Sequence, residues 1–406
     1  MSKIKLSGRD QDILTTLYRF RGMTALQLTQ IVHNSWEPKN SQKSMIHNYL
    51  KRLKKQKIIT SKKLEDEISL GSIYYLTPKG FQLAKDVLNI EIGQVGEGFK
   101  FADEIEGFHT HADLEYSIYK PPLEQISHHL LLIDSLIKLE FLYSEEQIDY
   151  RLSMYATREY KYKEIQGKLR PDSELHLSDG RNYFIEIDKG TESYQQLYEK
   201  FINYRNYLSQ IDINKFPAGI LFITDAKRQI YGLKRRWTTI LTAYMNAMDK
   251  LAVRVNLVLS PLNKLEETVL FEIKRLKYNQ IAAKSLKDYL ASQGNHSYRI
   301  KLSGIDRSLL YAIVTNGNRQ QLVFSRVVNE YESGAYSYFI YLFQNIKAII
   351  KTENISTLSP LGFEQSILFY KSHLPCLPLR FPEDKWPEKQ QTAIELLHDK
   401  LTWLSL

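Results

Sequence analysis

The chain has 406 residues, of which 43% are hydrophobic and 25% charged, and its formal net charge is +9. A chain of this length can form two or three domains, and its composition excludes a low-complexity or repeat-built protein. The positive balance favours nucleic acids or anionic membrane surfaces as partners and disfavours a basic ligand.

Targeting and redox signals are few. No run of about eighteen apolar residues and no signal-peptide pattern occurs, so the sequence predicts a cytoplasmic protein that does not span a membrane. The single cysteine, Cys376, rules out an internal disulfide and a cysteine-based zinc site within one chain.

The segment 1–92 predicts a winged helix-turn-helix domain, because it reads as three helices, a hairpin and a closing helix. Ser7 and Thr24 can cap the first two helices, and the third is expected to run to about Gln56. Two strands around a lysine-containing tip follow, and Pro78 begins the closing helix in its first turn.

The third helix is the predicted recognition helix. Its residues Ile46, Leu50 and Leu53 are spaced to form a buried stripe, which leaves cations on the outward face. The candidate DNA-binding residues on this helix and the wing are Lys43, His47, Lys51, Arg52, Lys54, Lys55, Lys62 and Lys63. Lysine attracts phosphates without reading bases, so the contact should be salt-sensitive and weakly selective. The alternative is a solvated helix face. The side chains available for base edges are Asn40, Gln42, His47 and Asn48.

Residues 93–122 form an expected connector with glycines and charges, which ends at a Pro-Pro pair. Residues 123–262 then predict a mixed sheet flanked by helices, because helical and strand patterns alternate. The expected elements are an apolar helix to about Tyr143, a strand at 149–155, two strands that carry carboxylates, a helix from Thr191 to Leu208, a buried strand at 217–224, a helix through Tyr244 and a strand at 251–259.

Three carboxylates on the two middle strands are the candidate metal ligands. Glu186 and Asp188 lie two residues apart and so point to one face of their strand, while Asp172 enters from the preceding strand. The Asp-Gly pair at 179–180 predicts a tight hairpin that would bring the strands together. Oxygen ligands of this kind favour Mg²⁺ or Mn²⁺. The alternative is an ion pair, with Lys189, Lys200 or Arg170 as the partner.

These residues resemble the signature of the restriction-endonuclease-like nucleases, in which Pro-Asp is followed by an acid, any residue and a lysine. Pro171-Asp172 and Glu186 match, whereas Asp188 stands at the lysine position. The longer string Arg170-Pro-Asp172, Glu186-Ile-Asp-Lys-Gly-Thr-Glu192, Lys200 and Tyr204, together with the N-terminal winged-helix pattern, resembles the replication-relaxation family of mobile-element proteins.

The resemblance implies a metal-dependent site. Asp172 and Glu186 would hold the metal, and Asp188 would complete its shell or orient a water. Lys200 would replace the missing lysine, because Gln196, Lys200 and Tyr204 share one helical face. A tyrosine nucleophile is the weaker mechanism, since no histidine cluster accompanies one.

Residues 263–406 are expected to be mainly helical and have no assigned role. The aromatic run at 336–343 predicts a buried helix, with a surface for a second subunit as the alternative. The fold expected overall is α/β (α+β across the domains). The expected function is metal-dependent nicking or relaxation of duplex DNA for plasmid replication or mobilisation, with a homodimer or other mobile-element proteins as further partners. The alternative is a non-catalytic DNA-binding regulator or replication initiator on a degenerate nuclease scaffold.

Overall fold

The computed structural model of the protein describes residues 5–64, 70–90, 113–146, 148–225, 231–292, 297–303, 309–316, 319–326 and 357–360. Most of the expected connector, the aromatic run at 336–343 and Cys376 lie outside these residues. The chain divides into two compact units, unit 1 with Met1–Glu159 and Lys168–Leu175, and unit 2 with Tyr160–Gly167 and His176–Leu406.

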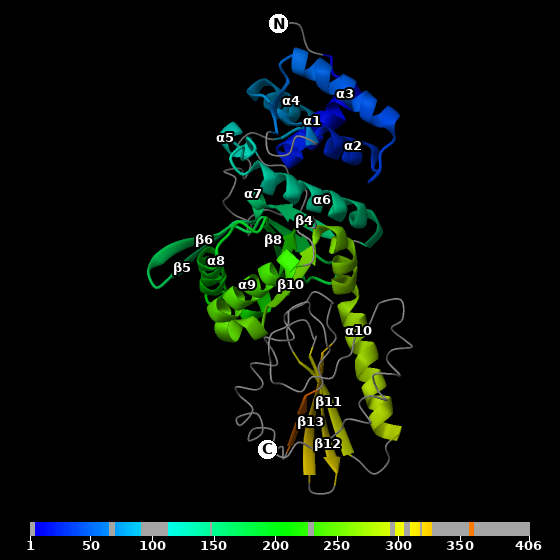
Figure 1. Ribbon diagram of the computed structural model, residues 1–406, viewed down its shortest axis with the longest axis vertical. Helices are drawn as coiled ribbons and strands as arrows, with labels where there is room; N and C mark the ends of the chain where they lie inside the picture. Colours follow the sequence, from blue (N-terminus) through cyan, green and yellow to red (C-terminus); the bar gives the residue numbers. More distant parts are fainter. Residues whose placement is uncertain are drawn as a thin grey trace. The chain divides into compact units, whose positions relative to one another are not determined.

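Unit 1 begins with the order of helices and strands that the winged-helix prediction requires (Figure 1). Its strands pair antiparallel in the order β1-β3-β2. The elements are α1 (Gly8–Phe20), β1 (Met23–Thr24), α2 (Ala25–His33), α3 (Asn40–Lys55), β2 (Ile59–Lys63), β3 (Ser72–Leu76) and α4 (Pro78–Leu88).

The residues predicted to begin helices lie at the starts of α1, α2 and α4. The Ser7 hydroxyl accepts a hydrogen bond from the amide of Asp10, and that of Thr24 accepts one from the amide of Gln27. Each cap is reciprocated by the side chain three residues on, which satisfies two amides that a helix start leaves open. Pro78 occupies the first turn of α4.

The rest of unit 1 packs on this domain. It comprises α5 (Tyr116–Tyr119), α6 (Ile126–Glu146), β4 (Asp149–Leu152) and α7 (Ser153–Ala156). The Gln27 side chain of α2 donates to the carbonyl of Leu130 at 3.2 Å and to Asp134 at 2.7 Å, both on α6. Arg19 of α1 binds Glu140 at 2.9 Å. Helix α6, which the sequence placed in the 123–262 domain, is therefore joined to the N-terminal helices.

A two-stranded ribbon follows, formed by β5 (Arg158–Tyr162) and β6 (Ile165–Leu169), and the sequence did not predict it. Its turn residues Lys163 and Glu164 have φ values of 46° and 67°. Two successive positive φ values are usually marked by Asn-Gly or Asp-Gly, so Lys-Glu gave no turn signal.

The central sheet has the strand order β10-β9-β8-β7-β4. It contains β7 (Ser173–His176), β8 (Asn182–Asp188), β9 (Gly219–Thr224) and β10 (Asn256–Pro261). Strands β8, β9 and β10 are parallel, with Asp188 opposite Thr224. The predicted tight turn before β8 is present, because the Leu177 amide donates to the Arg181 carbonyl at 2.8 Å and Gly180 has a φ of 86°.

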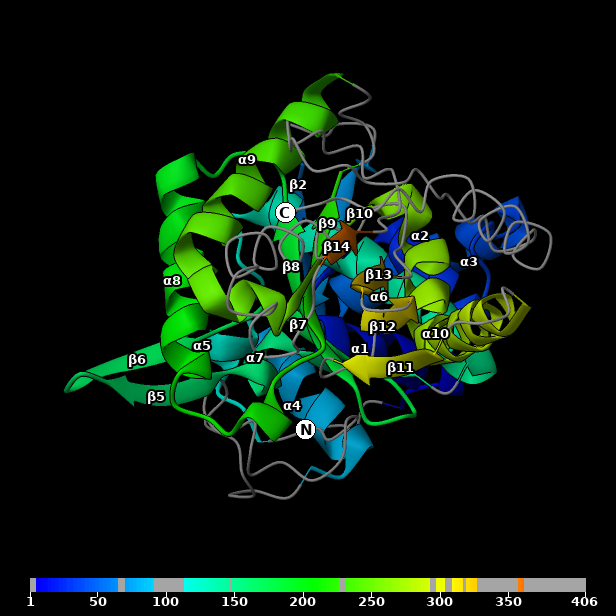
Figure 2. The same ribbon diagram turned by 90° about the horizontal axis from the view of Figure 1, so that it is seen from below.

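Helices cover both faces of strand β8. They are α8 (Tyr194–Leu208), α9 (Tyr231–Met248) and α10 (Leu265–Ser292). Phe184 packs on Tyr204 of α8, with ring centroids 5.6 Å apart, whereas the neighbouring Tyr183 donates a 2.7 Å hydrogen bond to Glu272 of α10. Phe201 of α8 contacts Tyr244 of α9, and these two helices lie side by side (Figure 2). The even-numbered residues of β8 therefore face α8 and α9, as the period of two predicts.

The C-terminal region was expected to be mainly helical, and its described residues begin with the long helix α10. The described residues after α10 add a four-stranded sheet in the order β11-β12-β13-β14, which was not expected as a sheet. These strands are β11 (Ser297–Ser303), β12 (Leu309–Asn316), β13 (Arg319–Arg326) and β14 (Thr357–Pro360). The run from Leu309 to Asn316 is rich in aliphatic and β-branched residues, which fits a strand better than a helix. Among the described helices, none has the length and apolar character needed to cross a bilayer.

Candidate functional site

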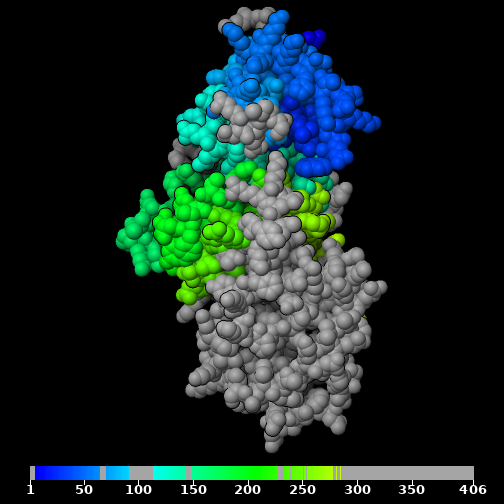
Figure 3. Space-filling view, viewed as in Figure 1, coloured from blue at the N-terminus to red at the C-terminus, as the bar shows by residue number. Residues whose placement is uncertain are grey.

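The first candidate surface is the outward face of α3 and the wing. Ile46, Leu50 and Leu53 are at most 1% exposed, so the predicted buried stripe is present. In the space-filling view α3 forms part of the surface of unit 1, in blue (Figure 3). Lys43 is half-buried, and the other predicted DNA-binding residues are exposed, namely His47, Lys51, Arg52, Lys54, Lys55, Lys62 and Lys63.

Two of these cations also hold the domain together. Arg52 pairs with Asp10 of α1 and lies over the ring of Tyr49, 4.7 Å from its centroid. Burial raises the pKa of Asp10, but hydrogen bonds from Ser7 and the Arg52 contact outweigh it, and the net pKa lies below the usual value. Lys54 donates to the Ser61 hydroxyl at 2.7 Å. Arg52 and Lys54 therefore fix α3 against α1 and β2.

The second candidate surface is built around Glu186 on β8. Its side chain is 4% exposed and accepts a 3.0 Å bond from the Lys200 ammonium. The Tyr204 hydroxyl donates to its other oxygen. Lys200 also binds Glu192 at 2.9 Å. The helical face that was predicted to supply a lysine to this strand thus reaches Glu186, and Tyr204 serves the core and the carboxylate together.

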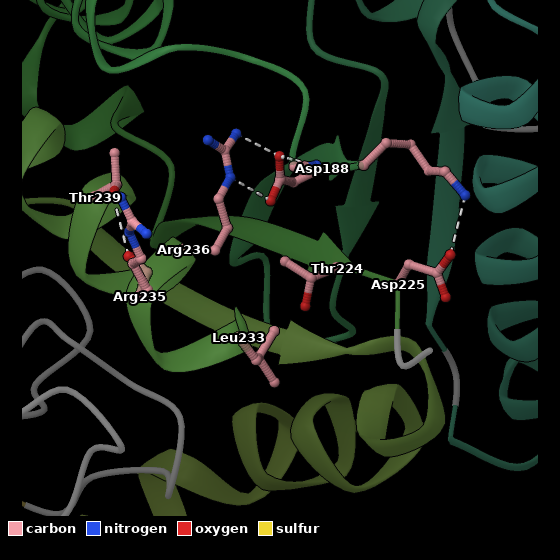
Figure 4. A pocket seen from close by; sticks show the side chains of 9 residues that line it. Asp188, Thr224, Asp225, Leu233, Arg235, Arg236 and Thr239 are labelled. Carbon is pink, nitrogen blue, oxygen red and sulfur yellow. Dashed lines mark hydrogen bonds and ion pairs between the residues drawn. The ribbon is translucent and has the colours of Figure 1, made fainter. Parts of the chain in front are cut away.

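Asp188 has a different partner. Its carboxylate is 1% exposed and is held by the Arg236 guanidinium through two hydrogen bonds, of which the one from Nε is 2.8 Å long (Figure 4). The Gly190 amide donates to it at 2.9 Å. Arg236 also donates to the backbone carbonyl of Glu192 at 2.5 Å. The opposite-face residue Lys189 turns instead to Asp225, 3.0 Å away.

Arg236 is the residue that the sequence did not identify. The need for it was visible, because a buried carboxylate requires a cation, but the partners considered lay within the motif or on α8. Arg236 is 48 residues from Asp188 along the chain, and only the packing of α9 on the sheet brings the two together. Nothing in the local sequence distinguishes it from its neighbour Arg235.

Asp172 lies in unit 1, immediately before β7. It is 22% exposed, and its carboxylate is 3.2 Å from the His128 Nε2 atom. The adjacent His129 is buried and contacts the Gly22 carbonyl at 3.0 Å. Burial lowers the pKa of His129 to about 4. The convergence of Asp172 with Glu186 and Asp188, which belong to unit 2, stays a prediction.

The side chains described so far limit how a metal could be bound. Among the described residues no group of three or more His, Cys, Asp and Glu side chains is placed to hold one. Mg²⁺ needs fewer protein ligands, because it usually takes one or two carboxylates and completes its shell with water and phosphate oxygens. Glu186, with Asp172 as the predicted second ligand, fits that pattern. Both oxygens of Asp188 are bonded to Arg236, and those of Glu186 are bonded to Lys200 and Tyr204, so either carboxylate would have to exchange a hydrogen-bond partner to bind a metal.

Comparison with known proteins gives one finding. The family model described as replication-relaxation matches residues 14–220, just over half of the chain. The match spans α1 to the start of β9 and so includes Asp172, Glu186, Asp188 and Lys200. No curated protein and no solved structure matches the chain.

Proposed function

This chain belongs to the replication-relaxation family, and from that membership we propose that it binds duplex DNA and nicks or relaxes it in plasmid replication or mobilisation. The family indicates a DNA-processing role in replication. The two candidate surfaces would have separate roles: the N-terminal domain would bind the duplex, and the site around Glu186 would cut it.

The N-terminal domain would locate the duplex. This role is supported by the basic face of α3. The wing lysines Lys62 and Lys63 are also exposed. A helix that presents Lys51 and Lys55 outward suits the phosphates flanking a groove. Arg52 contributes less to DNA contact than its charge suggests, because Asp10 already engages it.

The observation that carries the cutting role is the pair of Glu186 and Lys200, 3.0 Å apart. The nuclease signature needs an acid and a lysine at one point, and here the lysine comes from α8 instead of the strand. A bound Mg²⁺ would polarise the scissile phosphate and lower the pKa of the attacking water. Glu186 and Asp172 would hold it.

The residues of this chain have separate roles in that reaction. The Lys200 ammonium, which lies beside Glu186, would neutralise charge that develops on the phosphate oxygens. The Tyr204 hydroxyl keeps the Glu186 carboxylate in one orientation. Asp188 acts indirectly by holding Arg236 at the end of the strand.

The test is conversion of supercoiled plasmid to the nicked form with Mg²⁺ or Mn²⁺. Glu186→Gln and Asp172→Asn should abolish nicking and keep DNA binding. Glu199→Gln is the matched control, because Glu199 lies on the same helix as Lys200, is exposed and contacts Gln195. Nicking by Glu186→Gln at the wild-type rate would remove the proposed cutting centre.

A second candidate function has its own supporting observation. Glu186 and Asp188 are each neutralised by a cation of the chain, Lys200 and Arg236, so the sheet is electrostatically complete without a metal. This favours a DNA-binding regulator or replication initiator that keeps the nuclease scaffold. The same assay separates the two, because such a protein binds the plasmid but leaves it supercoiled at every metal concentration.

A further inference from the structure

A cavity of about 260 Å³ opens beside the Asp188–Arg236 pair in unit 2 (Figure 4). It lies where the parallel strands β8 and β9 end, at Asp188 and Thr224. Open α/β sheets commonly bind their ligands outside the carboxyl ends of such strands. The lining residues are Asp188, Lys189, Gly190, Thr224, Asp225, Leu233, Arg235, Arg236 and Thr239.

The charges around this cavity favour an anion. Three cationic side chains, Lys189, Arg235 and Arg236, face two carboxylates, Asp188 and Asp225, in the lining. The carboxylates are already bound to Arg236 and Lys189. The excess positive charge therefore rests with Arg235, which is exposed at the cavity.

Arg236 is prepared to bind such a ligand. Its hydrogen bonds to Asp188 and to the Glu192 carbonyl use three of the five N–H donors of a guanidinium. The Glu192 carboxylate lies 3.9 Å from one of its terminal nitrogens, beyond hydrogen-bonding distance, so within the described residues two donors can still take a ligand. The group is already fixed, so little side-chain entropy is lost when a ligand binds. A planar guanidinium with free donors is well suited to phosphate oxygens.

We propose that this cavity binds one phosphodiester group of a DNA strand, with Arg235 and Arg236 as the phosphate-binding residues. Its volume is below the roughly 300–1,000 Å³ of pockets that enclose whole small molecules, which suits a single phosphate with part of its sugar. The inference rests on the proposed function only in that DNA is the partner, and it requires no cleavage.

The experiment measures binding of the full chain to a labelled single-stranded tetranucleotide, which is too short to serve a winged helix. Arg235→Gln should weaken this binding about tenfold, the effect of losing one charge-assisted hydrogen bond of about 1.4 kcal/mol. Arg235→Lys should recover part of the loss. Arg254→Gln is the matched control, because Arg254 is also an exposed arginine of unit 2, and its affinity should stay within about twofold of wild type.

The outcomes are distinct. Equal affinity of wild type and Arg235→Gln for the tetranucleotide would contradict the proposed site. An equal loss of affinity in Arg254→Gln would also contradict it, because the attraction would then come from the overall positive charge of the protein. Binding of a free mononucleotide as tight as that of the tetranucleotide would overturn the assignment to a strand. Failure of plasmid nicking does not affect this measurement, and retained tetranucleotide binding alongside absent nicking would reject only the cutting role.

Discussion

The chemistry of Asp188 shows how one side chain can change the meaning of a motif. The position that carries lysine in the nuclease signature is an acid here, yet a cation still reaches this end of β8, because Asp188 binds Arg236. The charge at that point is thus supplied through a partner on α9. A buried pair of this kind adds little net stability, but breaking it is costly.

This predicts an asymmetric response to mutation. Arg236→Gln leaves the Asp188 carboxylate buried without its charge partner, and the free energy of unfolding should fall by about 3–5 kcal/mol. The double variant Asp188→Asn/Arg236→Gln removes both charges and should recover more than half of the loss. Urea denaturation midpoints test this. Equal losses in the single and double variants would show that the charge pairing is not what matters.

His129 predicts a pH dependence of stability. Its pKa is lowered to about 4 by burial, whereas in the unfolded chain it is about 6.5. The contribution of neutral His129 is complete above pH 6.5 and is lost as pH falls toward 4, because only the unfolded state then takes up the proton.

The expected loss is about 3 kcal/mol between pH 7 and pH 4. His129→Gln can keep a donor near the Gly22 carbonyl but does not titrate, so its stability should fall less over this range. Urea midpoints at pH 7 and pH 4 measure the difference. His47→Gln is the control, because His47 is exposed. If wild type and His129→Gln lose stability in parallel, the buried histidine is not the source.

Among the helices, α3 and α8 were predictable through their buried stripes, because residue spacing is a local feature of the sequence; their starts were not, since the N-cap of α3 is Lys39, whose side chain makes no capping hydrogen bond. Ile46, Leu50 and Leu53 lie on the buried face of α3 as the spacing requires. Helix α8 begins after Ser193 instead of Thr191, since the Ser193 hydroxyl caps the Gln196 amide. The β5–β6 ribbon was missed because its turn is Lys163-Glu164, whose left-handed backbone the sequence does not announce.

The exposed face of α3 predicts a salt dependence. If Lys51 and Lys55 each neutralise a phosphate, Lys51→Gln/Lys55→Gln should reduce the slope of log affinity against log salt by about 0.9 per lost contact. Fluorescence anisotropy with duplex DNA at several salt concentrations measures this slope. Lys215→Gln is the control, because Lys215 is exposed and lies in unit 2. An unchanged slope in the double variant would place the duplex elsewhere.

For the molecule as a whole, the sequence located the acidic positions and the lysine that pairs with Glu186, because strand and helix periodicities are local. It did not find Arg236, or the contact of Asp172 with His128, because tertiary packing alone creates these pairs. The sheet that follows α10 was not predicted as a sheet. Strand pairing such as that of β13 with β14 joins residues more than thirty positions apart, and no local pattern reports it.

The proposed cutting role depends most on Lys200, which lies 3.0 Å from Glu186. Its direct test is the single-turnover rate of Mg²⁺-dependent plasmid nicking by Lys200→Met, with Lys215→Met as the matched control. The predicted result is a fall of about 10²–10³-fold for Lys200→Met, with plasmid affinity and the control unchanged. Nicking by Lys200→Met at the wild-type rate would contradict the account.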